Sequence, residues 1–332
     1  MLLNKQYIIG VDGGGTKTRA VIGTRSGEVL ATVEGAGANI KSTPPEEVRQ
    51  QMMKLLTRLL QKVGATRTDV STTFLCIAGG DRQEDLVRWH KWMELFFTSE
   101  SCKVYVTNDA VAALTSGTFA HEGLVLIAGT GSIVYCVQKN NRVSRVGGWG
   151  YLFGDEGSGY YIGQQALRVI AQHYDAFGRD GDAFTEAILK QLVLKDPTEI
   201  ITFIYEHAQP RVLIASIVQT VLQLAEQGNK TAEIIIERAI TCLAQLLLTM
   251  FQKEPKVKSF PIVTCGGLFE SSYFTNCFQE KLQQVAINNR LIQPEVPPVI
   301  GAFVKGLISE GILITKSVQQ IVKETWMSNI NK

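Results

Sequence analysis

Short apolar runs separated by turn residues open the chain and predict strands. One run covers residues 7–12 and ends in glycines, and two more lie at 19–23 and 29–33. Runs of this length, bounded by glycine and polar turns, are typical of strands rather than helices. The opening therefore predicts an antiparallel meander whose first bend is rich in glycine.

From residue 43 the apolar positions recur at helical spacing, and proline stands in the first turn. A buried-type strand at 73–81, a helix through Trp89 and Trp92, and a strand at 103–107 come next. Strands that alternate with helices in this way predict an α/β lobe.

The second half of the chain is mainly helical in pattern, from residue 160 to about 253. One more buried-type strand is expected at 260–265, and a helix is expected from residue 297. Small residues on that last helix, such as Gly301 and Gly306, would allow a neighbouring backbone to approach closely.

The opening pattern returns after 116 residues. An apolar run at 124–128 leads into a loop of glycine and hydroxyl residues, and a strand and a polar turn follow, as they do at the start. When Ser132 is laid on Thr16, Asp12 falls opposite Ala128. We infer a duplicated lobe in which only the first loop carries a carboxylate.

Length and composition limit the class of protein. A chain of 332 residues predicts about two domains, and 45% hydrophobic residues can form a large core. The net charge of +2 gives no reason to expect a nucleic-acid or membrane partner. Because we see no run of about 18 apolar residues and no signal peptide, a cytoplasmic location is expected. The six scattered cysteines are expected to be reduced, mostly buried thiols without a metal.

Three glycine-rich loops each follow an apolar strand: Gly13-Gly14-Gly15-Thr16, Gly129-Thr130-Gly131-Ser132 and Gly266-Gly267. Glycine lets backbone N–H groups converge on an anion, so such loops can bind phosphates. A single loop of this kind would more often be a tight hairpin, but three at strand ends favour a phosphate site. The dinucleotide fingerprint and the Walker P-loop are both absent.

Six motifs follow one another along the chain: Val11-Asp12-Gly13-Gly14-Gly15-Thr16-Lys17-Thr18, Thr107-Asn108-Asp109-Ala110, Ala128-Gly129-Thr130-Gly131-Ser132, Gly147-Gly148-Trp149-Gly150, Gly154-Asp155-Glu156-Gly157-Ser158 and Cys265-Gly266-Gly267-Leu268. In this order they resemble the motifs of N-acetylglucosamine kinases. These kinases belong to the BadF/BadG/BcrA/BcrD ATPase group of the actin, hexokinase and Hsp70 superfamily. The similarity runs from Gly10 to Gly306.

The resemblance implies an α/β fold of two ribonuclease H-like (actin-like ATPase) domains, with a cleft for nucleotide and sugar between them. It places an N-terminal lobe at 1–117 plus about 297–332, and a C-terminal lobe at 118–296. It implies ATP and Mg²⁺ as cofactors and an amino sugar as the small-molecule substrate. The oligomeric state stays open, with a homodimer as one option.

The activity implied is transfer of the γ-phosphoryl group of ATP to the 6-hydroxyl of N-acetylglucosamine. N-acetylmuramate or glucosamine kinase is the alternative within this class. An ATP-hydrolysing activator of a partner enzyme, or a sugar sensor without turnover, is the alternative from another class. The activators hold an iron-sulfur cluster with cysteines near a helix end, and no cysteine pair here offers one.

The resemblance also implies roles for single residues. Asp109 would be the catalytic base that accepts the proton of the sugar hydroxyl, although it could also cap the helix after it. Asp12 would hold Mg²⁺. The residues matched to nucleotide binding are Gly13, Gly14, Gly15, Thr16, Lys17, Gly129, Thr130, Gly131, Ala215, Gly266, Gly267 and Leu268.

The residues matched to sugar binding supply amides, carboxylates and an aromatic ring. Two alternatives remain open at this stage. The acidic pair Asp155-Glu156 could simply begin a helix at Ser158, and Asn39 could be an ordinary turn residue. The sugar-binding set is Asn39, Gly80, Asp81, Asp109, Gly148, Trp149, Asp155 and Glu156.

Overall fold

The elements of the chain fall into two compact units. We call Met1–Gly123, Val137–Arg142 and Ile292–Lys332 unit 1, and Leu124–Cys136 and Val143–Leu291 unit 2. The lobe boundaries expected from the resemblance stay a prediction. The structure, a computed structural model, describes residues 7–15, 17–40, 43–78, 83–97, 102–138, 142–178 and 181–330.

Unit 1 is built on a sheet of five strands. These are β1 (Tyr7–Gly13), β2 (Lys17–Thr24), β3 (Val29–Ala36), β4 (Val70–Ile77) and β5 (Lys103–Asn108). Their order is β3-β2-β1-β4-β5. β1 pairs antiparallel with β2, which confirms the glycine-rich bend, and parallel with β4, which is parallel to β5. The expected strand at 73–81 ends at Ile77, and residues 79–81 lie outside the described part.

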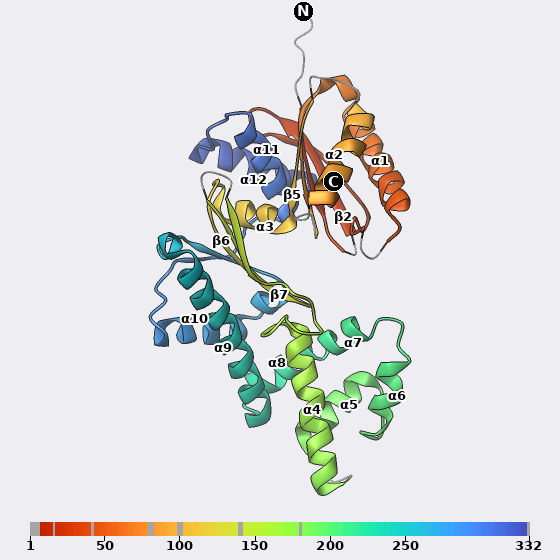
Figure 1. Cartoon of the computed structure of the whole chain (residues 1–332), viewed down its shortest axis with the longest axis vertical. Helices are drawn as coiled ribbons and strands as arrows, with labels where there is room; N and C mark the ends of the chain where they lie inside the picture. Colours follow the sequence, from red (N-terminus) through yellow and green to blue (C-terminus); the bar gives the residue numbers. More distant parts are fainter. Residues whose placement is uncertain are drawn as a thin grey trace, which may run out of the picture. The chain divides into compact units, whose positions relative to one another are not determined.

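Helices cover both faces of this sheet. One face packs against α1 (Pro45–Lys62) and α2 (Gln83–Phe97), and the other against α11 (Pro298–Ser309) and α12 (Lys316–Ile330) (Figure 1). Ile9 belongs to the first core and its neighbour Ile8 to the second. A strand buried on both faces must be apolar at successive positions, which is why 7–12 is a continuous apolar run. A short 3₁₀ helix (Arg67–Asp69) precedes β4.

Small residues let α11 lie directly on its neighbours, as the sequence predicts. A Cβ on Gly10 of β1 would lie 2.3 Å from the backbone nitrogen of Phe303. A Cβ on Gly301 would lie 1.9 Å from the carbonyl oxygen of Ala112 in α3 (Asp109–Thr118). Side chains larger than hydrogen at these positions would force the backbones apart.

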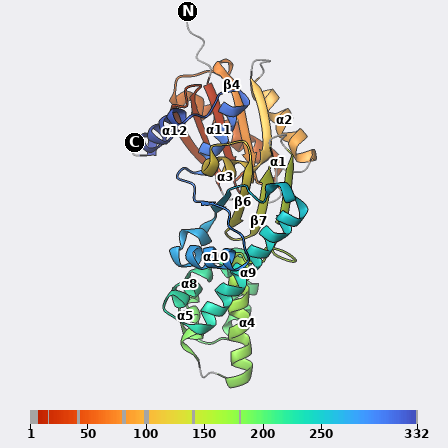
Figure 2. The same cartoon turned by 90° about the vertical axis from the view of Figure 1, so that its left-hand side faces the viewer.

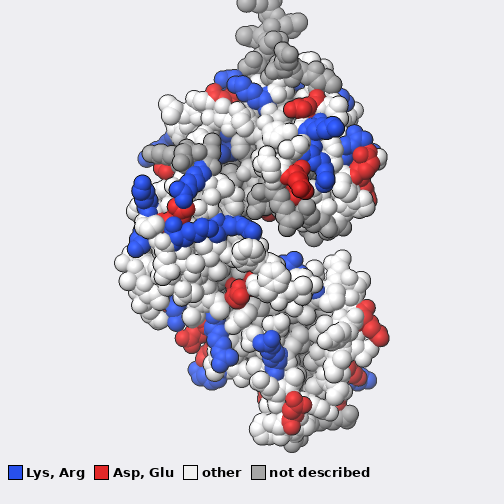
Figure 3. Space-filling model, in the orientation of Figure 1, with Lys and Arg blue, Asp and Glu red and all other residues white. Residues whose placement is uncertain are grey.

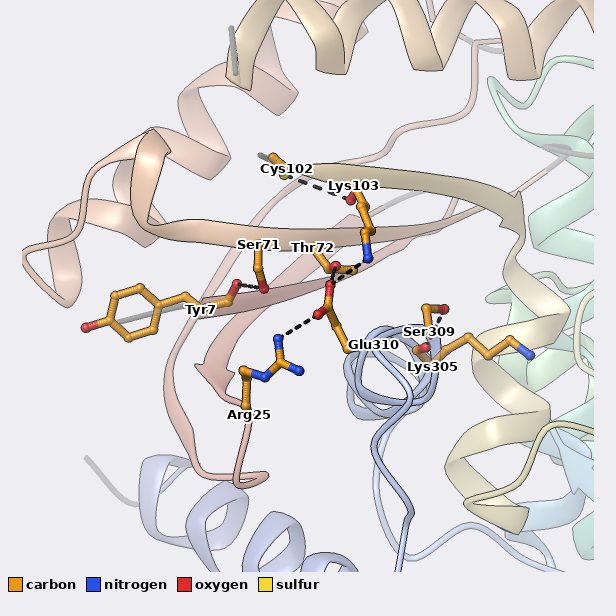
Figure 4. A network of polar contacts seen from close by, with 9 residues as sticks. All are labelled: Tyr7, Arg25, Ser71, Thr72, Cys102, Lys103, Lys305, Ser309 and Glu310. Carbon is orange, nitrogen blue, oxygen red and sulfur yellow. Dashed lines mark hydrogen bonds and ion pairs between the residues drawn. The ribbon is translucent and has the colours of Figure 1, made fainter. Parts of the chain in front are cut away.

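A buried carboxylate at the end of α11 joins four parts of unit 1. Glu310 accepts hydrogen bonds from Thr72 on β4 and from Arg25 in the β2–β3 turn, the latter at 2.7 Å (Figure 4). The Nζ of Lys103 on β5 lies 4.0 Å from the same carboxylate. Because the Glu310 side chain is only 7% exposed, two cations and a hydroxyl are needed to offset its desolvation.

Unit 2 repeats the strand order of unit 1. Its strands are β6 (Gly123–Ala128), β7 (Ser132–Val137), β8 (Val143–Gly147), β9 (Ile262–Cys265) and β10 (Leu291–Ile292). Their order is β10-β9-β6-β7-β8, so β8, β7, β6, β9 and β10 correspond in turn to β3, β2, β1, β4 and β5. The shared order supports the duplication inferred from the sequence.

The helical region of unit 2 consists of several separate helices (Figure 2). They surround one apolar core that continues onto β6, β7 and β9. The helices are α4 (Gly159–Phe177), α5 (Ala183–Leu192), α6 (Glu199–Tyr205), α7 (Pro210–Ser216), α8 (Val218–Glu226), α9 (Lys230–Lys253) and α10 (Ser272–Gln284), with 3₁₀ turns at Pro255–Val257 and Gly267–Glu270.

One helix among the described residues, α9, is long and apolar enough to cross a membrane by length and composition. The sequence pattern predicts a helix here with a broad apolar face toward the core of the second lobe, and shows no unbroken run of about 18 apolar residues. Half of its most apolar window is buried within the chain, where Ile236, Leu243 and Leu247 belong to the core of unit 2. Long apolar helices of this kind also occur as core helices of globular domains.

The surface charge is mixed, as the low net charge predicts, but the burial of the cysteines differs from expectation. On the face shown in Figure 3, basic and acidic side chains occur together over each unit. None of the six cysteines, all of which lie in the described part of the chain, forms a disulfide, as expected. The expectation that most are buried is wrong, because only Cys76 and Cys136 are buried and the other four are partly exposed.

Replacing the buried carboxylate should destabilise unit 1 much more than replacing an exposed one. Glu310→Gln removes the charge that faces Arg25 and Lys103, and we expect it to lower the free energy of unfolding by about 1–3 kcal/mol. Glu295→Gln is the matched control, because Glu295 pairs with Lys323 at 2.9 Å but is 73% exposed; it should cost less than about 1 kcal/mol. Urea denaturation measures both, and equal costs would contradict the role given to Glu310.

Candidate active site

Two carboxylates meet at one edge of the unit 1 sheet. Asp12 lies near the end of β1, and Asp109 follows the end of β5 directly. Since both strands are parallel to β4, their carboxyl ends lie at the same edge. The pKa of Asp12 is raised to about 6, first by burial and then by the charge of Asp109, against the opposing effects of Arg19 and Lys17.

The cap of α3 is Asn108 rather than Asp109. The Asn108 side chain accepts a hydrogen bond from the N–H of Ala110 at 2.9 Å. The alternative that Asp109 serves as the N-cap is therefore wrong. Asp109 is instead the first residue of α3, and its charge acts on Asp12.

The first glycine loop is held by backbone hydrogen bonds. The N–H of Gly14 donates to Lys17 O at 2.9 Å, and the N–H of Ala38 donates to Gly14 O at 3.0 Å. A Cβ on Gly13 would lie 2.6 Å from Ile77, whereas Gly15 has open space around it. The loop thus presents Gly15 outward. Because Ala38 is hydrogen-bonded to Gly14, the next residue, Asn39, lies beside this loop. Thr16 lies outside the described residues.

The second glycine loop rests on the N-terminus of α4. The N–H of Gly159 donates to Gly129 O at 2.7 Å, and that of Gly129 donates to Gly131 O at 2.9 Å. The positive end of a helix dipole therefore adjoins this loop. A Cβ on Gly159 would lie 3.5 Å from Ala215 O, so α7 adjoins the loop as well.

The third glycine loop packs on the second. A Cβ on Gly266 would lie 2.4 Å from Ala128 O, and Gly266 has a φ of +99°. Side chains are excluded there by both space and backbone conformation. Leu268, which the resemblance matches to the nucleotide, is 2% exposed and belongs to the apolar core, so its side chain packs internally.

The segment matched to the sugar converges on Ser132 of the second loop. The Ser132 N–H donates to Asp155 Oδ1 at 3.3 Å, and its hydroxyl donates to Glu156 O at 2.7 Å. Gly148 N–H donates to Ser132 O at 3.1 Å. Asp155 is 4% exposed and has a φ of +64°, an unusual conformation for a residue with a side chain. Burial, the largest effect, raises the pKa of its carboxyl.

Trp149 lies in an exposed apolar turn. Its side chain is 64% exposed, and Leu152 and Phe153 nearby are exposed as well. The guanidinium of Arg145 stacks 5.1 Å from the Trp149 ring and donates to Gly148 O at 3.0 Å. An aromatic face open to solvent is suited to an apolar face of a sugar ring.

Within each unit, the predicted residues gather at the glycine loops. Unit 1 brings Asp12, Gly13, Gly14, Asn39 and Asp109 to one region, while Gly80 and Asp81 lie outside the described residues. In unit 2 the members are Gly129, Thr130, Gly131, Gly148, Trp149, Asp155, Glu156, Ala215, Gly266 and Gly267.

Two arginines join the matched residues at the site, and the sequence indicates only Arg145, as a cation near the sugar motifs. Arg145 contacts Gly148 and Trp149, and Arg211 contacts Asp155. Neither stands inside a motif that matches the resemblance. Arg145 is close to the segment 148–156 in the sequence, whereas only the fold brings Arg211 to it.

Comparison with known proteins identifies the family of this chain. A family described as the BadF/BadG/BcrA/BcrD ATPase family matches residues 9–306. The chain belongs to this family. An N-acetylmuramic acid/N-acetylglucosamine kinase of Clostridium acetobutylicum is 35% identical over 90% of this chain and 97% of its own. An N-acetyl-D-glucosamine kinase of Dictyostelium discoideum is 29% identical over 93% of this chain and all of its own.

A solved structure confirms the fold class of this family member. A candidate N-acetylglucosamine kinase of Chromobacterium violaceum superposes with a TM-score of 0.70 at 23% identity, over 92% of this chain and all of its own. A ROK hexokinase of Thermus thermophilus gives a TM-score of 0.57 at 15% identity, over 92% of this chain and 99% of its own. The predicted α/β fold of paired actin-like ATPase units is confirmed.

Adjacent glycines of the third loop should differ sharply in tolerance. Gly266→Ala meets a carbonyl oxygen and adopts a left-handed conformation, so we expect it to lower the free energy of unfolding by about 1–3 kcal/mol. Gly267→Ala is the control, because no atom lies within 4 Å of its Cβ position and its φ is not positive. Chemical denaturation of both variants measures the difference, and equal stabilities would contradict the close packing of the two loops.

Proposed function

We propose that the protein is an ATP-dependent kinase that phosphorylates the primary 6-hydroxyl of an amino sugar, with N-acetylglucosamine as the preferred substrate. The names of the two relatives that match over about nine tenths of this chain support an amino-sugar kinase. The observation that carries the proposal is the pair Asp12 and Asp109, which lie at the carboxyl ends of β1 and β5 beside a glycine loop. A cytoplasmic location, expected from the sequence, suits a reaction that consumes ATP.

Asp109 accepts the proton of the attacking hydroxyl. Phosphoryl transfer requires that the sugar hydroxyl lose its proton as the new O–P bond forms, and a carboxylate within hydrogen-bond reach can take it. Asn108 already caps α3, so the Asp109 carboxylate is not needed for that helix. The leaving group is the β-phosphate oxygen of ATP, and the product is a phosphate monoester.

Asp12 is suited to hold Mg²⁺. Magnesium in kinases is held by one or two carboxylates together with waters and substrate phosphates, and the described residues contain no group of three or more acidic, His or Cys ligands that could bind a metal. Burial beside Asp109 makes the negative charge of Asp12 unfavourable, which a cation would relieve. When bound, Mg²⁺ would neutralise charge on the transferring phosphates.

The glycine loops bind the nucleotide. Gly15 is open to its surroundings and Lys17 stands just after it, so this end of unit 1 can approach a phosphate. Gly129, Thr130 and Gly131 lie over the N-terminus of α4, where an anion is favoured. We assign the adenosine to Ala215 and the backbone of Gly266 and Gly267, and Thr16 to a phosphate.

The sugar is assigned to groups that match a neutral, hydroxyl-rich ring. Asn39 supplies an amide, Trp149 an aromatic face, and Asp155 and Glu156 carboxylates; Gly80, Asp81 and Gly148 complete the set. N-acetylglucosamine is preferred over glucosamine, because loss of the acetyl group leaves an apolar space unfilled at a cost of about 1–3 kcal/mol.

N-acetylmuramate is a second candidate substrate, and Arg145 favours it. Its lactyl group adds a carboxylate to the ring, which calls for a nearby cation. The guanidinium of Arg145 lies against Gly148 and Trp149, both assigned to the sugar. A charged hydrogen bond there would stabilise an acidic sugar.

The alternative from another class is an ATP-hydrolysing activator of a partner enzyme. Such a protein would hydrolyse ATP in the absence of any sugar. Its activity would not depend on a base that faces a sugar hydroxyl.

Replacing the base tests the mechanism. Asp109→Asn should lower kcat for N-acetylglucosamine by about 10²- to 10⁴-fold and change the sugar affinity far less, because only the proton acceptor is lost. Asp69→Asn is the control, since Asp69 caps a 3₁₀ helix in the same unit. A coupled assay of ADP release and a sugar-binding titration separate the two effects. Turnover within a few-fold of the parent enzyme would disprove the role of Asp109.

A further inference from the structure

Arg211 joins α7 to the buried carboxylate of the sugar segment. Its Nη2 donates to Asp155 Oδ2 at 3.0 Å. Its guanidinium carbon lies 5.3 Å from the ring centroid of Tyr151, which in turn packs edge-on against Tyr160 of α4 at 5.2 Å. Although the Arg211 side chain is 41% exposed, its Nε is buried without a hydrogen-bond partner. The guanidinium is thus held by an ion pair on one side and an aromatic ring on another.

α7, which carries Arg211, has a fixed place on α4. A Cβ on Gly163 would lie 1.9 Å from Ile214 O, so the two helices touch backbone to backbone. α7 also carries Ala215, which we assign to the nucleotide. Arg211 is therefore anchored to the same short helix as the proposed adenine contact.

The Asp155 carboxylate is buried against the second glycine loop, where a negative charge is unfavourable. Its Oδ2 would lie 2.9 Å from a Cβ on Gly131, so the carboxylate packs directly on the second glycine loop. Burial raises the pKa of Asp155, and the neighbouring carboxylate of Glu156 adds to the rise. The Ser132 N–H and the Arg211 guanidinium act in the opposite direction. These two donors, from β7 and α7, are what favour the ionised form.

We propose that Arg211 is a positioning residue that keeps Asp155 ionised and fixed against the second glycine loop, ready to accept hydrogen bonds from sugar hydroxyls. The proposal rests on the proposed function, in which Asp155 binds the sugar. Arg211 acts through Asp155 and is not itself assigned to the sugar. Its place on α7 also ties the sugar segment to the nucleotide helix.

The pH profile of sugar use tests this role. Binding through the Asp155 carboxylate is lost as pH falls through its pKa, and loss of Arg211 raises that pKa. In Arg211→Ala the acid limb of kcat/KM for N-acetylglucosamine should therefore move up by about one pH unit, a tenfold loss at a pH below the limb. In Arg211→Lys, which keeps the positive charge, the acid limb should move up less than in Arg211→Ala. Arg168→Ala, an exposed arginine on α4, should match the parent.

A double variant tests whether Arg211 acts through Asp155. If it does, Arg211→Ala should lower kcat/KM in the parent enzyme but add no further loss and no pH shift to Asp155→Asn. An unchanged acid limb in Arg211→Ala, or full additivity in the double variant, would overturn the proposal. Failure of the proposed function would be seen separately, as absence of sugar phosphorylation by the parent enzyme.

Discussion

Two carboxylates crowd one edge of a sheet that is buried on both faces, and this electrostatic strain governs the proposed site. Asp12 lies one residue before the end of β1, among apolar neighbours, and Asp109 follows the end of β5 and acts on it. Burial, and after it the charge of Asp109, raises the pKa of Asp12 to about 6, and Arg19 and Lys17 offset this rise only in part. A divalent cation at Asp12, or a proton accepted by Asp109, would relieve this repulsion.

The two units place a carboxylate at their glycine loops in different ways. They share one strand order, and each places a glycine loop after its first strand. Unit 1 has Asp12 within that strand, whereas unit 2 has Ala128 at the matching position. Unit 2 brings a carboxylate to its loop from elsewhere, because Asp155 in a left-handed turn bonds to the N–H of Ser132. Arg211 then supplies a cation to that buried carboxylate.

Local patterns predicted the parts of the structure that depend on short stretches of sequence. Continuous apolar runs gave β1 and β6, and the small residues of α11 indicated its close packing at Gly301. The order of the motifs indicated Asp109 as the candidate base, which stays a prediction; the structure shows that its neighbour Asn108 caps α3.

Features that depend on tertiary contacts were not predictable in this way. Arg211 follows an ordinary proline at the start of a short helix, and only the packing of α7 on α4 brings it to Asp155. Leu268 lies in a matched motif, but whether its side chain meets a ligand or the core depends on how the third loop packs. The length of α9 likewise has meaning only once its burial is known.

Product analysis tests the central claim most directly. The parent protein is incubated with ATP, Mg²⁺ and equal concentrations of N-acetylglucosamine, N-acetylmuramate and glucosamine, and mass spectrometry follows ADP and each sugar phosphate. The account predicts one sugar phosphate for each ADP formed, with N-acetylglucosamine consumed about 10- to 200-fold faster than glucosamine. Release of ADP without a phosphate ester of any of the three sugars would contradict it.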